Sequence, residues 1–388
     1  MPWRGRGRSL AERTPILPLY PNRGLSLVGG EGAYLIARDG SRYLDLMSNY
    51  GASLLGQAHP AVTAALRGQL GGLVTLHGSF GNDLRLRASM ALLRRLPLPS
   101  AELCWLNSGT EAIEAALKFA IQASGRRRFI ACTGGYHGKT LGALAVTHAG
   151  KYRALFDGLL LPVDHVPFGV AASVEAAITT ETAAVIVEPI QGEGGVQVPP
   201  DGYLGELREI CTARDVLLIV DEIQTGCGRT GTFTVSEREG IEPDILCLGK
   251  GLAGGVPIGV AAVGATVAER VTRGIHTSTF GGNPLAAAGV LATLSILTPE
   301  LLARVERLGA EWRESLTALG VEVRGRGLMV GVVLPGRQDQ LLKELQLERV
   351  LAIPAGEDVI RFLPPLIVGE AELERGTEAL RASLRKRE

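Results

Sequence analysis

Residues 216–231 read VLLIVDEIQTGCGRTG and residues 244–250 read DILCLGK, and these two segments decide the fold. Each contains a short apolar run without alternation, which predicts a strand buried on both faces of a parallel sheet. The first run ends at Asp221 and Glu222, and the second at Gly249 and Lys250. Ligands bind outside the carboxyl ends of such strands, so Asp221 and Lys250 are expected to face one pocket. Burial there favours the neutral amine of Lys250, the form that attacks a carbonyl. From these segments alone, a helix-capping Asp221 and a surface Lys250 are the alternative.

Strands and helices alternate through the middle of the chain. Apolar runs at 103–106, 129–132 and 183–187 precede these two segments, with helices expected between them. This order predicts an α/β fold with a mainly parallel, doubly wound sheet. A glycine-rich strand pair is expected after Lys250, and helices and strands continue from 284 to the end. The hairpin at 33–47, which turns at Asp39-Gly40, is assigned to the smaller lobe. We therefore expect an N-terminal part of the small lobe at 1–47, a large domain at 48–283 and a C-terminal small domain at 284–388.

The overall composition excludes several classes of partner. The 388 residues include 40 Lys+Arg and 40 Asp+Glu, so no net charge indicates nucleic acid or an anionic membrane. No apolar run approaches the roughly 20 residues that span a bilayer. The basic start MPWRGRGRSL has no apolar core, so it is not a secretory signal and is interpreted as a flexible tail. The five cysteines lack metal-ligand spacing, which predicts no metal site and a reducing cytoplasm.

Other polar groups follow the remaining strands. Ser108, Gly109 and Thr110 stand between a strand and a helix, where free N–H groups and hydroxyls make an anion site, although an ordinary capped helix is the alternative. Tyr136, His137 and Lys139 lie between glycines at the next strand end. The loop EPIQGEGG follows a further strand and carries Glu188 and Glu193.

Pyridoxal phosphate is one cofactor that uses all these groups. It offers a phosphate, a flat ring, a pyridine nitrogen, a phenolic oxygen and an aldehyde. A lysine binds the aldehyde as an imine, and an acid holds a proton on the ring nitrogen through a charge-assisted hydrogen bond. That proton makes the ring an electron sink.

Six motifs, taken together and in this order, resemble the class III aminotransferases of pyridoxal-phosphate fold type I, acetylornithine and ornithine branch. The resemblance runs from about Tyr20 to the C-terminus. The motifs are SGTEA (108–112), GYHGKT (135–140), VEPIQGEGG (187–195), DEIQTGCGRTG (221–231), LGKGLAGGVP (248–257) and STFGGNP (278–284). The resemblance implies fold type I, with a large cofactor-binding domain and a smaller α/β lobe built from both ends of the chain.

The resemblance also implies cofactor roles. Lys250 forms the aldimine and moves the proton, and Asp221 pairs with the pyridine nitrogen. Gln224 reaches the phenolic oxygen, and Tyr136 and Ile223 cover the two faces of the ring. The remaining cofactor-binding residues are those of the phosphate cradle and its surroundings: Ser108, Gly109, Thr110, His137 and, across a homodimer interface with shared active sites, Thr279.

Substrate roles are implied in the same way. Glu193 resembles a switch glutamate that masks Arg361 while the donor binds and releases it to grip the α-carboxylate of 2-oxoglutarate. Tyr20 aligns with a tyrosine that touches the donor carboxylate, and Ser278 lies near the substrate. Lys139 departs from the family, which has Arg there, and a lysine cannot form the planar fork.

The function that follows is transfer of a terminal amino group from an ω-amino donor, of N-acetylornithine or acyl-lysine type, to 2-oxoglutarate. The products are a semialdehyde and glutamate, and the enzyme passes through its pyridoxamine phosphate form. Lys139 keeps open a diamine (putrescine-type) or other ω-aminotransferase. Two further hypotheses are a glutamate-semialdehyde-type aminomutase and a non-catalytic protein that keeps the fold.

Overall fold

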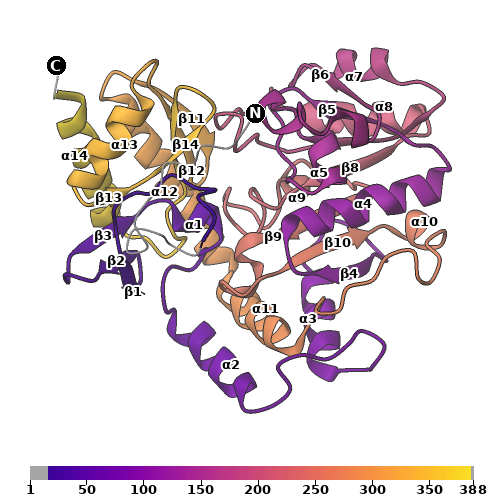
Figure 1. Ribbon diagram of the computed structural model, residues 1–388, viewed down its shortest axis with the longest axis horizontal. Helices are drawn as coiled ribbons and strands as arrows, with labels where there is room; N and C mark the ends of the chain where they lie inside the picture. The colour runs from indigo at the N-terminus through magenta and orange to yellow at the C-terminus, as the bar shows by residue number, and fades with distance from the viewer. Residues whose placement is uncertain (1–15, 386–388) are drawn as a thin grey trace, which may run out of the picture.

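A computed structural model describes residues 16–385, so the basic start of the chain lies outside the described residues. Its centre is a seven-stranded sheet in the larger lobe (Figure 1). In spatial order the strands are β4 (Glu102–Leu106), β10 (Gly259–Val263), β9 (Ile245–Gly249), β8 (Leu217–Asp221), β7 (Thr182–Val187), β5 (Arg128–Cys132) and β6 (Val163–Val166). Only β10 runs against its neighbours, so the other six strands share one direction. The expected mainly parallel sheet is confirmed.

Both faces of this sheet are covered, because successive side chains of a strand point to opposite faces. In β8, Leu217 and Ile219 pack into one apolar core, and Leu218 and Val220 pack into another. Helices on both sides complete the two cores. They are α4 (Gly109–Ser124), α5 (Leu141–Val146) and α10 (Ala265–Ala268) on one face, and α7 (Ala171–Ala177), α8 (Tyr203–Ala213) and α9 (Val235–Arg238) on the other. The strand ends are therefore the open part of the sheet.

The smaller lobe joins both ends of the described chain (Figure 1). One sheet pairs the N-terminal hairpin with a C-terminal strand, in the order β1 (Leu27–Glu31), β2 (Tyr34–Ala37), β3 (Arg42–Asp45) and β13 (Val350–Leu351). A second sheet has the order β11 (Glu322–Arg326), β12 (Met329–Val333), β15 (Val359–Phe362) and β14 (Ile353–Ala355). Its helices are α12 (Pro299–Thr317), α13 (Gln338–Leu347) and α14 (Glu370–Arg385). This assembly agrees with the expected small α/β lobe.

A helical region connects the two lobes. It contains α1 (Ser48–Gly51), α2 (Pro60–Leu70), α3 (Asp83–Leu93) and α11 (Pro284–Ile296). Two short elements, α6 (Gly150–Arg153) and η2 (Asp157–Leu159), belong to the large lobe. The expected limits of the domains stay a prediction. Because α11 packs against α2 and α3, we propose that the second limit lies after α11 and not at 283.

One sequence-based prediction is wrong. The segment after Lys250 was expected to form two strands, but η3 (Lys250–Ala253) is a 3-10 turn and only β10 follows. The reason is local, since Gly254 and Gly255 have φ of +63° and +100°, which reverse the chain.

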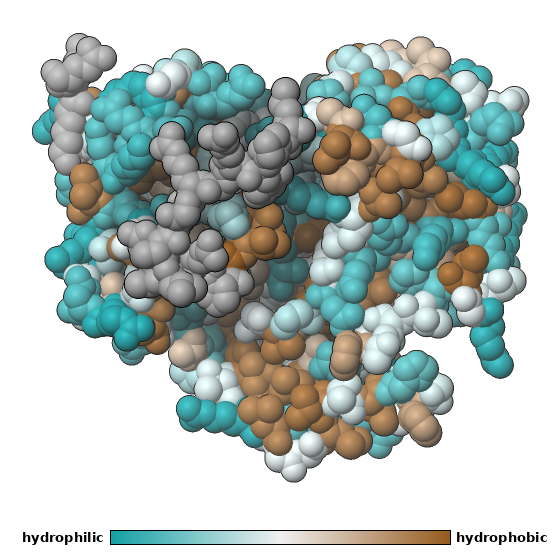
Figure 2. Space-filling view, viewed as in Figure 1, coloured by the Kyte–Doolittle hydropathy of each residue, from teal (hydrophilic) through white to brown (hydrophobic). Residues whose placement is uncertain are grey.

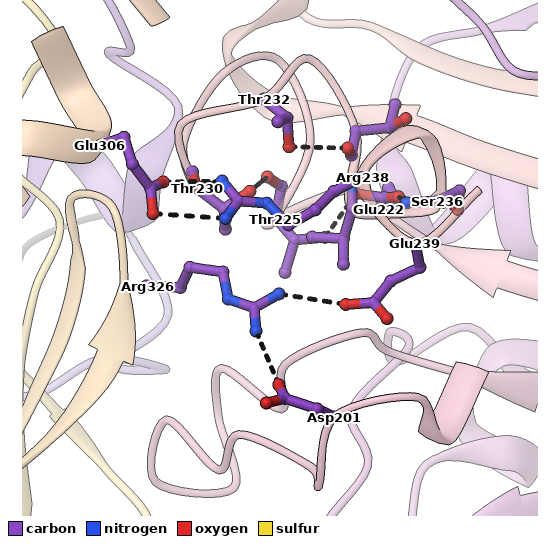
Figure 3. A network of polar contacts seen from close by, with 12 residues as sticks. Asp201, Glu222, Thr225, Thr230, Thr232, Ser236, Arg238, Glu239, Glu306 and Arg326 are labelled. Carbon is purple, nitrogen blue, oxygen red and sulfur yellow. Dashed lines mark hydrogen bonds and ion pairs between the residues drawn. The ribbon is translucent and has the colours of Figure 1, made fainter. Parts of the chain in front are cut away.

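Ion pairs join the large lobe to the small lobe (Figure 3). Arg238 of α9 binds Glu306 of α12 at 2.6 Å, and Arg326 of β11 binds Glu239 at 3.2 Å. Glu222, directly after β8, is buried and accepts hydrogen bonds at the start of α9, including one from the Ser236 N–H at 2.7 Å. The second carboxylate of the DEIQ motif therefore anchors a helix at the lobe junction.

Among residues 16–385, no single helix is long and apolar enough to cross a bilayer, and the one pair that passes by length and composition, α11 with α12, is bent by 71°.

Apolar surface gathers over α2, α3 and α11 (Figure 2). Large exposed apolar side chains of α2, α3 and the loop between them are Leu70, Leu73, Val74, Phe80, Leu86 and Met90.

Candidate active site

Asp221 and Lys250 lie at the ends of two neighbouring parallel strands. Asp221 is the last residue of β8 and pairs in register with Cys247 of β9, three residues before Lys250. Lys250 is half-buried, and its φ of +46° is in the left-handed region that non-glycine residues rarely adopt. Such strain persists only where the surrounding structure holds it, and it is common at functional sites.

Asp221 is fixed by a buried histidine. Its Oδ2 lies 2.7 Å from His137 Nδ1, and its Oδ1 accepts a hydrogen bond from the Ile223 N–H at 3.0 Å. Burial alone would lower the pKa of His137, but the Asp221 hydrogen bond and the charges of Asp221 and Glu188 outweigh it, so the pKa is raised. The imidazole therefore orients the Asp221 carboxylate in an apolar setting.

Lys250 is surrounded by charged groups of both lobes. Burial, followed by the nearby Arg361, lowers the pKa of its amine, while Glu193, Asp221 and Glu188 oppose that shift. Within the described residues its ammonium has no hydrogen-bond or ion-pair partner. A lysine with a lowered pKa and no partner suits attack on a carbonyl carbon.

The N-terminus of α4 opens toward the same strand ends. Ser108 is its N-cap and accepts a hydrogen bond from the Glu111 N–H at 3.3 Å. The Glu111 carboxylate accepts a hydrogen bond from the Asn107 N–H at 2.6 Å. In a standard capping box the donor would be the N–H of the N-cap residue, which is one position later. A Cβ on Gly109 would lie 2.8 Å from Ile223, so the motifs SGT and DEIQ touch. The first-turn N–H groups of a helix lack an intrahelical acceptor, which makes this helix start suitable for an anion.

Arg361 of β15 reaches this region from the small lobe. Its side chain is 0 % exposed; Nη2 donates to Glu193 Oε1 at 2.5 Å, and Nη1 donates to Gln224 Oε1 at 2.9 Å. Its buried Nε has no partner among residues 16–385. Glu193 is 33 % exposed, so this partner of the buried cation can move into solvent. The expected ion pair between Glu193 and Arg361 is present, and Gln224 is a second hydrogen-bond partner of the guanidinium.

A cavity of about 560 Å³ opens beside these groups. Tyr136, Tyr50 and Glu193 line it. Burial, then the charge of Glu193 and neighbouring hydroxyls including that of Tyr20, raises the pKa of Tyr136 to about 12. Tyr20 is 83 % exposed, and the charge of its hydroxyl contributes to this rise in the pKa of Tyr136. The size suits a small organic ligand.

Three predicted residues lie farther out. Lys139 is exposed, with its Nζ 4.2 Å from the centroid of the Tyr152 ring. Ser278 is half-buried, and its Oγ accepts hydrogen bonds from Asn107 Nδ2 and the Gly281 N–H, each at 3.0 Å. Thr279 is exposed on the same loop and makes no contact with the site within the described part of this protomer.

Sequence reasoning assigned no role to two residues of this region. Glu188 is buried directly after β7 and accepts hydrogen bonds from the Tyr136 N–H at 2.9 Å and the Gly192 N–H at 3.3 Å. Burial raises its pKa to about 7, and His137 opposes the shift. An acid after a fully apolar strand is the signal that singled out Asp221, so it could have singled out Glu188. Tyr50, whose ring centroid is 5.8 Å from the Arg361 guanidinium, carried no such signal.

The groups present fit pyridoxal phosphate. A helix N-terminus suits the phosphate, a buried carboxylate suits a protonated ring nitrogen, and an unpaired lysine suits the aldehyde. Gly109 leaves the approach to that helix N-terminus free of a side chain. Within residues 16–385, no three His, Cys, Asp or Glu side chains are grouped to hold a metal ion.

Comparisons with known proteins show the family of this chain. A family model described as aminotransferase class-III matches residues 20–384. An acetylornithine aminotransferase of Methanopyrus kandleri is 42 % identical, over 94 % of this chain and 96 % of the relative. A LysW-aminoadipate semialdehyde/glutamate semialdehyde transaminase of Sulfolobus acidocaldarius is 39 % identical, over 96 % and 97 %. An ornithine aminotransferase structure from Toxoplasma gondii has a TM-score of 0.90 at 34 % identity and covers 95 % of this chain and 92 % of that chain. The chain therefore belongs to the class III aminotransferases, enzymes that depend on pyridoxal phosphate and act on an amino donor and a keto acid.

Proposed function

We propose that this enzyme transfers the terminal amino group of an ω-amino donor of N-acetylornithine or acyl-lysine type to 2-oxoglutarate. The observation that carries the proposal is the buried Arg361, held by a movable Glu193 within the electrostatic reach of Lys250. The names of the relatives from Methanopyrus kandleri and Sulfolobus acidocaldarius support the donor class. The products would be a semialdehyde and glutamate.

We assign the cofactor contacts as follows. The cradle of Ser108, Gly109 and Thr110 would hold the phosphate, and Asp221, backed by His137, would hold the ring nitrogen. Tyr136 and Ile223 would cover the ring, and the Gln224 amide would reach its phenolic oxygen. When bound, the cofactor supplies an electron-withdrawing ring that stabilises negative charge on the carbon bearing the donor's amine.

Lys250 has two tasks in this proposal. It would hold the cofactor aldehyde at rest. Once the donor's amine has displaced it from that carbon, its freed amine would take the proton from the donor carbon that carries the amino group. The lowered pKa supports the second task, because a neutral amine accepts a proton and a fully protonated one does not. The Asp221 carboxylate, oriented by His137, would hold the proton on the ring nitrogen.

The pair of Glu193 and Arg361 would distinguish the two halves of the reaction. While Glu193 covers Arg361, this guanidinium is not free to bind an α-carboxylate, so the donor would enter through its distal amine. When Glu193 moves toward solvent, the guanidinium is left buried with one amide partner. It then binds the α-carboxylate of 2-oxoglutarate in a bidentate contact. Tyr20 and Ser278 are assigned to substrate contacts at the two sides of the site.

We further propose a homodimer with shared active sites. The exposed apolar side chains over α2 and α3 are the surface that supports it (Figure 2). Arg85 ties this surface to the loop of Thr279, donating to the carbonyls of Leu76 and Gly282 at 2.6 Å each. Thr279 would thus lie at the interface and contact the partner's phosphate. All five cysteines are free, which supports a cytoplasmic location.

The test is a pair of half-reactions with the purified enzyme. N-acetylornithine should rapidly remove the visible absorption band of the bound cofactor, and putrescine should do so slowly. The reverse order would establish the diamine alternative that Lys139 keeps open. Lys250→Ala should lack the band, and a band that survives this substitution would contradict the assignment of Lys250.

A further inference from the structure

The buried carboxylate of Glu188 lies between two loops of the candidate site. Glu188 directly follows β7, and both of its oxygens accept backbone hydrogen bonds. Oε2 accepts from the Tyr136 N–H at 2.9 Å, and Oε1 accepts from the Gly192 N–H at 3.3 Å. Hydrogen bonds to an ionised acceptor are roughly twice as strong as those between neutral groups. This one side chain therefore holds two backbone segments that are far apart in sequence.

Each of the two N–H groups belongs to a segment with a proposed task. Tyr136 is assigned to the cover of the cofactor ring, and Gly192 directly precedes Glu193, the residue that moves between the two half-reactions. Gly192 also packs against the Gln224 amide, because a Cβ added to it would lie 2.0 Å from Gln224 Oε1. A shift of the Gly192 backbone therefore cannot occur without a change around the amide.

The backbone on both sides of Glu193 is held by further hydrogen bonds. The Gly356 N–H of the small lobe donates to the Glu193 carbonyl at 2.7 Å. Gln191 and Gln197 exchange two backbone hydrogen bonds, of 3.0 and 3.1 Å, at the base of the loop. Together with the bond at the Gly192 N–H, these contacts restrain the backbone while the side chain of Glu193 stays partly exposed. The movement proposed for Glu193 is therefore a side-chain rotation on a restrained backbone.

The two loops that Glu188 joins are also packed directly against each other. The Gln191 amide donates from Nε2 to the Thr133 carbonyl at 2.9 Å. A Cβ added to Gly194 would lie 2.7 Å from the Gly134 carbonyl oxygen. The ring cover and the loop of Glu193 consequently form one packed unit, with the Glu188 carboxylate inside it.

We propose that Glu188 is a positioning residue for the transamination reaction, holding the ring cover Tyr136 and the backbone before Glu193 in one arrangement. The inference rests on the proposed function for the tasks of Tyr136 and Glu193. In this role Glu188 acts through two backbone N–H groups and not by contact with the substrate. Because one carboxylate serves both loops, its loss should weaken the binding of the cofactor and of 2-oxoglutarate together.

The test uses two substitutions that remove the double contact in different ways. Glu188→Gln leaves one oxygen as an acceptor, and Glu188→Asp keeps both oxygens on a side chain that is one methylene shorter. At pH 8, above the pKa of about 7 of Glu188, each should raise two constants about 10-fold. These are the Kd of pyridoxal phosphate for the cofactor-free enzyme and the apparent Kd of 2-oxoglutarate for the aminated enzyme. Asp244→Asn is the matched control, because Asp244 accepts the Leu218 N–H at 2.7 Å at the other end of β8, and it should leave both constants unchanged.

Hydrogen–deuterium exchange of the cofactor-bound enzyme tests the two contacts without any turnover. Amides in residues 133–140 and 188–197 should exchange about 10-fold faster in both variants of Glu188, whereas those of α8 should not change. Slow exchange in both segments would show that other contacts hold the loops and would overturn the proposal.

The two measurements together separate this proposal from the proposed function. Faster exchange with unchanged binding constants, or a rise in only one of the two constants, would refute the joint positioning role. If the wild-type enzyme does not react with 2-oxoglutarate, the proposed acceptor is wrong. The positioning role then still stands if the Kd of pyridoxal phosphate and the exchange of both loops change as expected.

Discussion

A methyl group added at Gly192 should separate the two halves of the reaction. The Cβ of Gly192→Ala would lie 2.0 Å from Gln224 Oε1 and 3.0 Å from Arg361 Nη1, whereas ordinary contacts begin at 3.4 Å. The amide must therefore retreat by roughly 1.4 Å, which breaks its 2.9 Å hydrogen bond to Arg361. A hydrogen bond to a charged group is worth roughly 1.5–3 kcal/mol, so the apparent affinity for 2-oxoglutarate should fall roughly 10- to 150-fold.

Stopped-flow absorbance of each half-reaction measures this effect directly. The aminated enzyme is mixed with 2-oxoglutarate, and the cofactor-bound enzyme is mixed with the amino donor. The loss should be confined mainly to the first experiment, because Glu193 covers Arg361 while the donor reacts. Gly205→Ala in α8, where nothing lies within 4 Å of the added Cβ, is the matched control. An equal loss in both half-reactions, or no loss in either, would refute the proposed link between Gln224 and Arg361.

Two further predictions concern buried charges away from the substrate. Burial raises the pKa of Glu188 from 4.5 to about 7, so the stability that its retained proton provides is fully present below pH 4.5 and is lost as the pH rises through 7. In urea titrations of the cofactor-free protein between pH 4.5 and 8, the free energy of unfolding should fall by roughly 3 kcal/mol, and this fall should be absent in Glu188→Gln. The same pH profile for both proteins would contradict this role of Glu188. Arg229 is fully buried and donates to the carbonyls of Leu328 and Pro364, so Arg229→Lys should lower the free energy of unfolding by roughly 2–4 kcal/mol. Arg238→Lys, in a half-exposed ion pair, should lower it by less than about 1 kcal/mol, and equal effects of the two substitutions would argue against an anchoring role for Arg229.

The parts of the fold that local sequence could predict are those with a local cause. The runs that became β8 and β9 are apolar without alternation because both of their faces are covered, and that pattern is visible in one strand at a time. Asp221 and Lys250 stood out because charge follows directly after such a run. Ser108 and Glu111 stood out because a helix start has its own short pattern.

The parts that sequence could not predict depend on contacts between distant segments. The reversed direction of β10 follows from the turn at Gly254 and Gly255 and from pairing with both β4 and β9. The hydrogen bond between Gln224 and Arg361 joins residues 137 positions apart. No periodicity encodes a contact of this kind, so the motif resemblance assigned Gln224 to the cofactor alone. In the structure the same amide accepts a hydrogen bond from Arg361.

Donor selection in this enzyme has to occur at the entrance of the site. The groups around Lys250 meet the reacting amine and its carbon, which are the same in N-acetylornithine and in a diamine. In the proposed reaction Arg361 is covered by Glu193 while the donor binds, so it would not contact the donor's far end. We expect that end to lie near Tyr136 and Tyr152, which line the same cavity. A lysine in place of the family arginine at position 139 keeps one positive charge beside the Tyr152 ring, so it does not by itself indicate a diamine substrate.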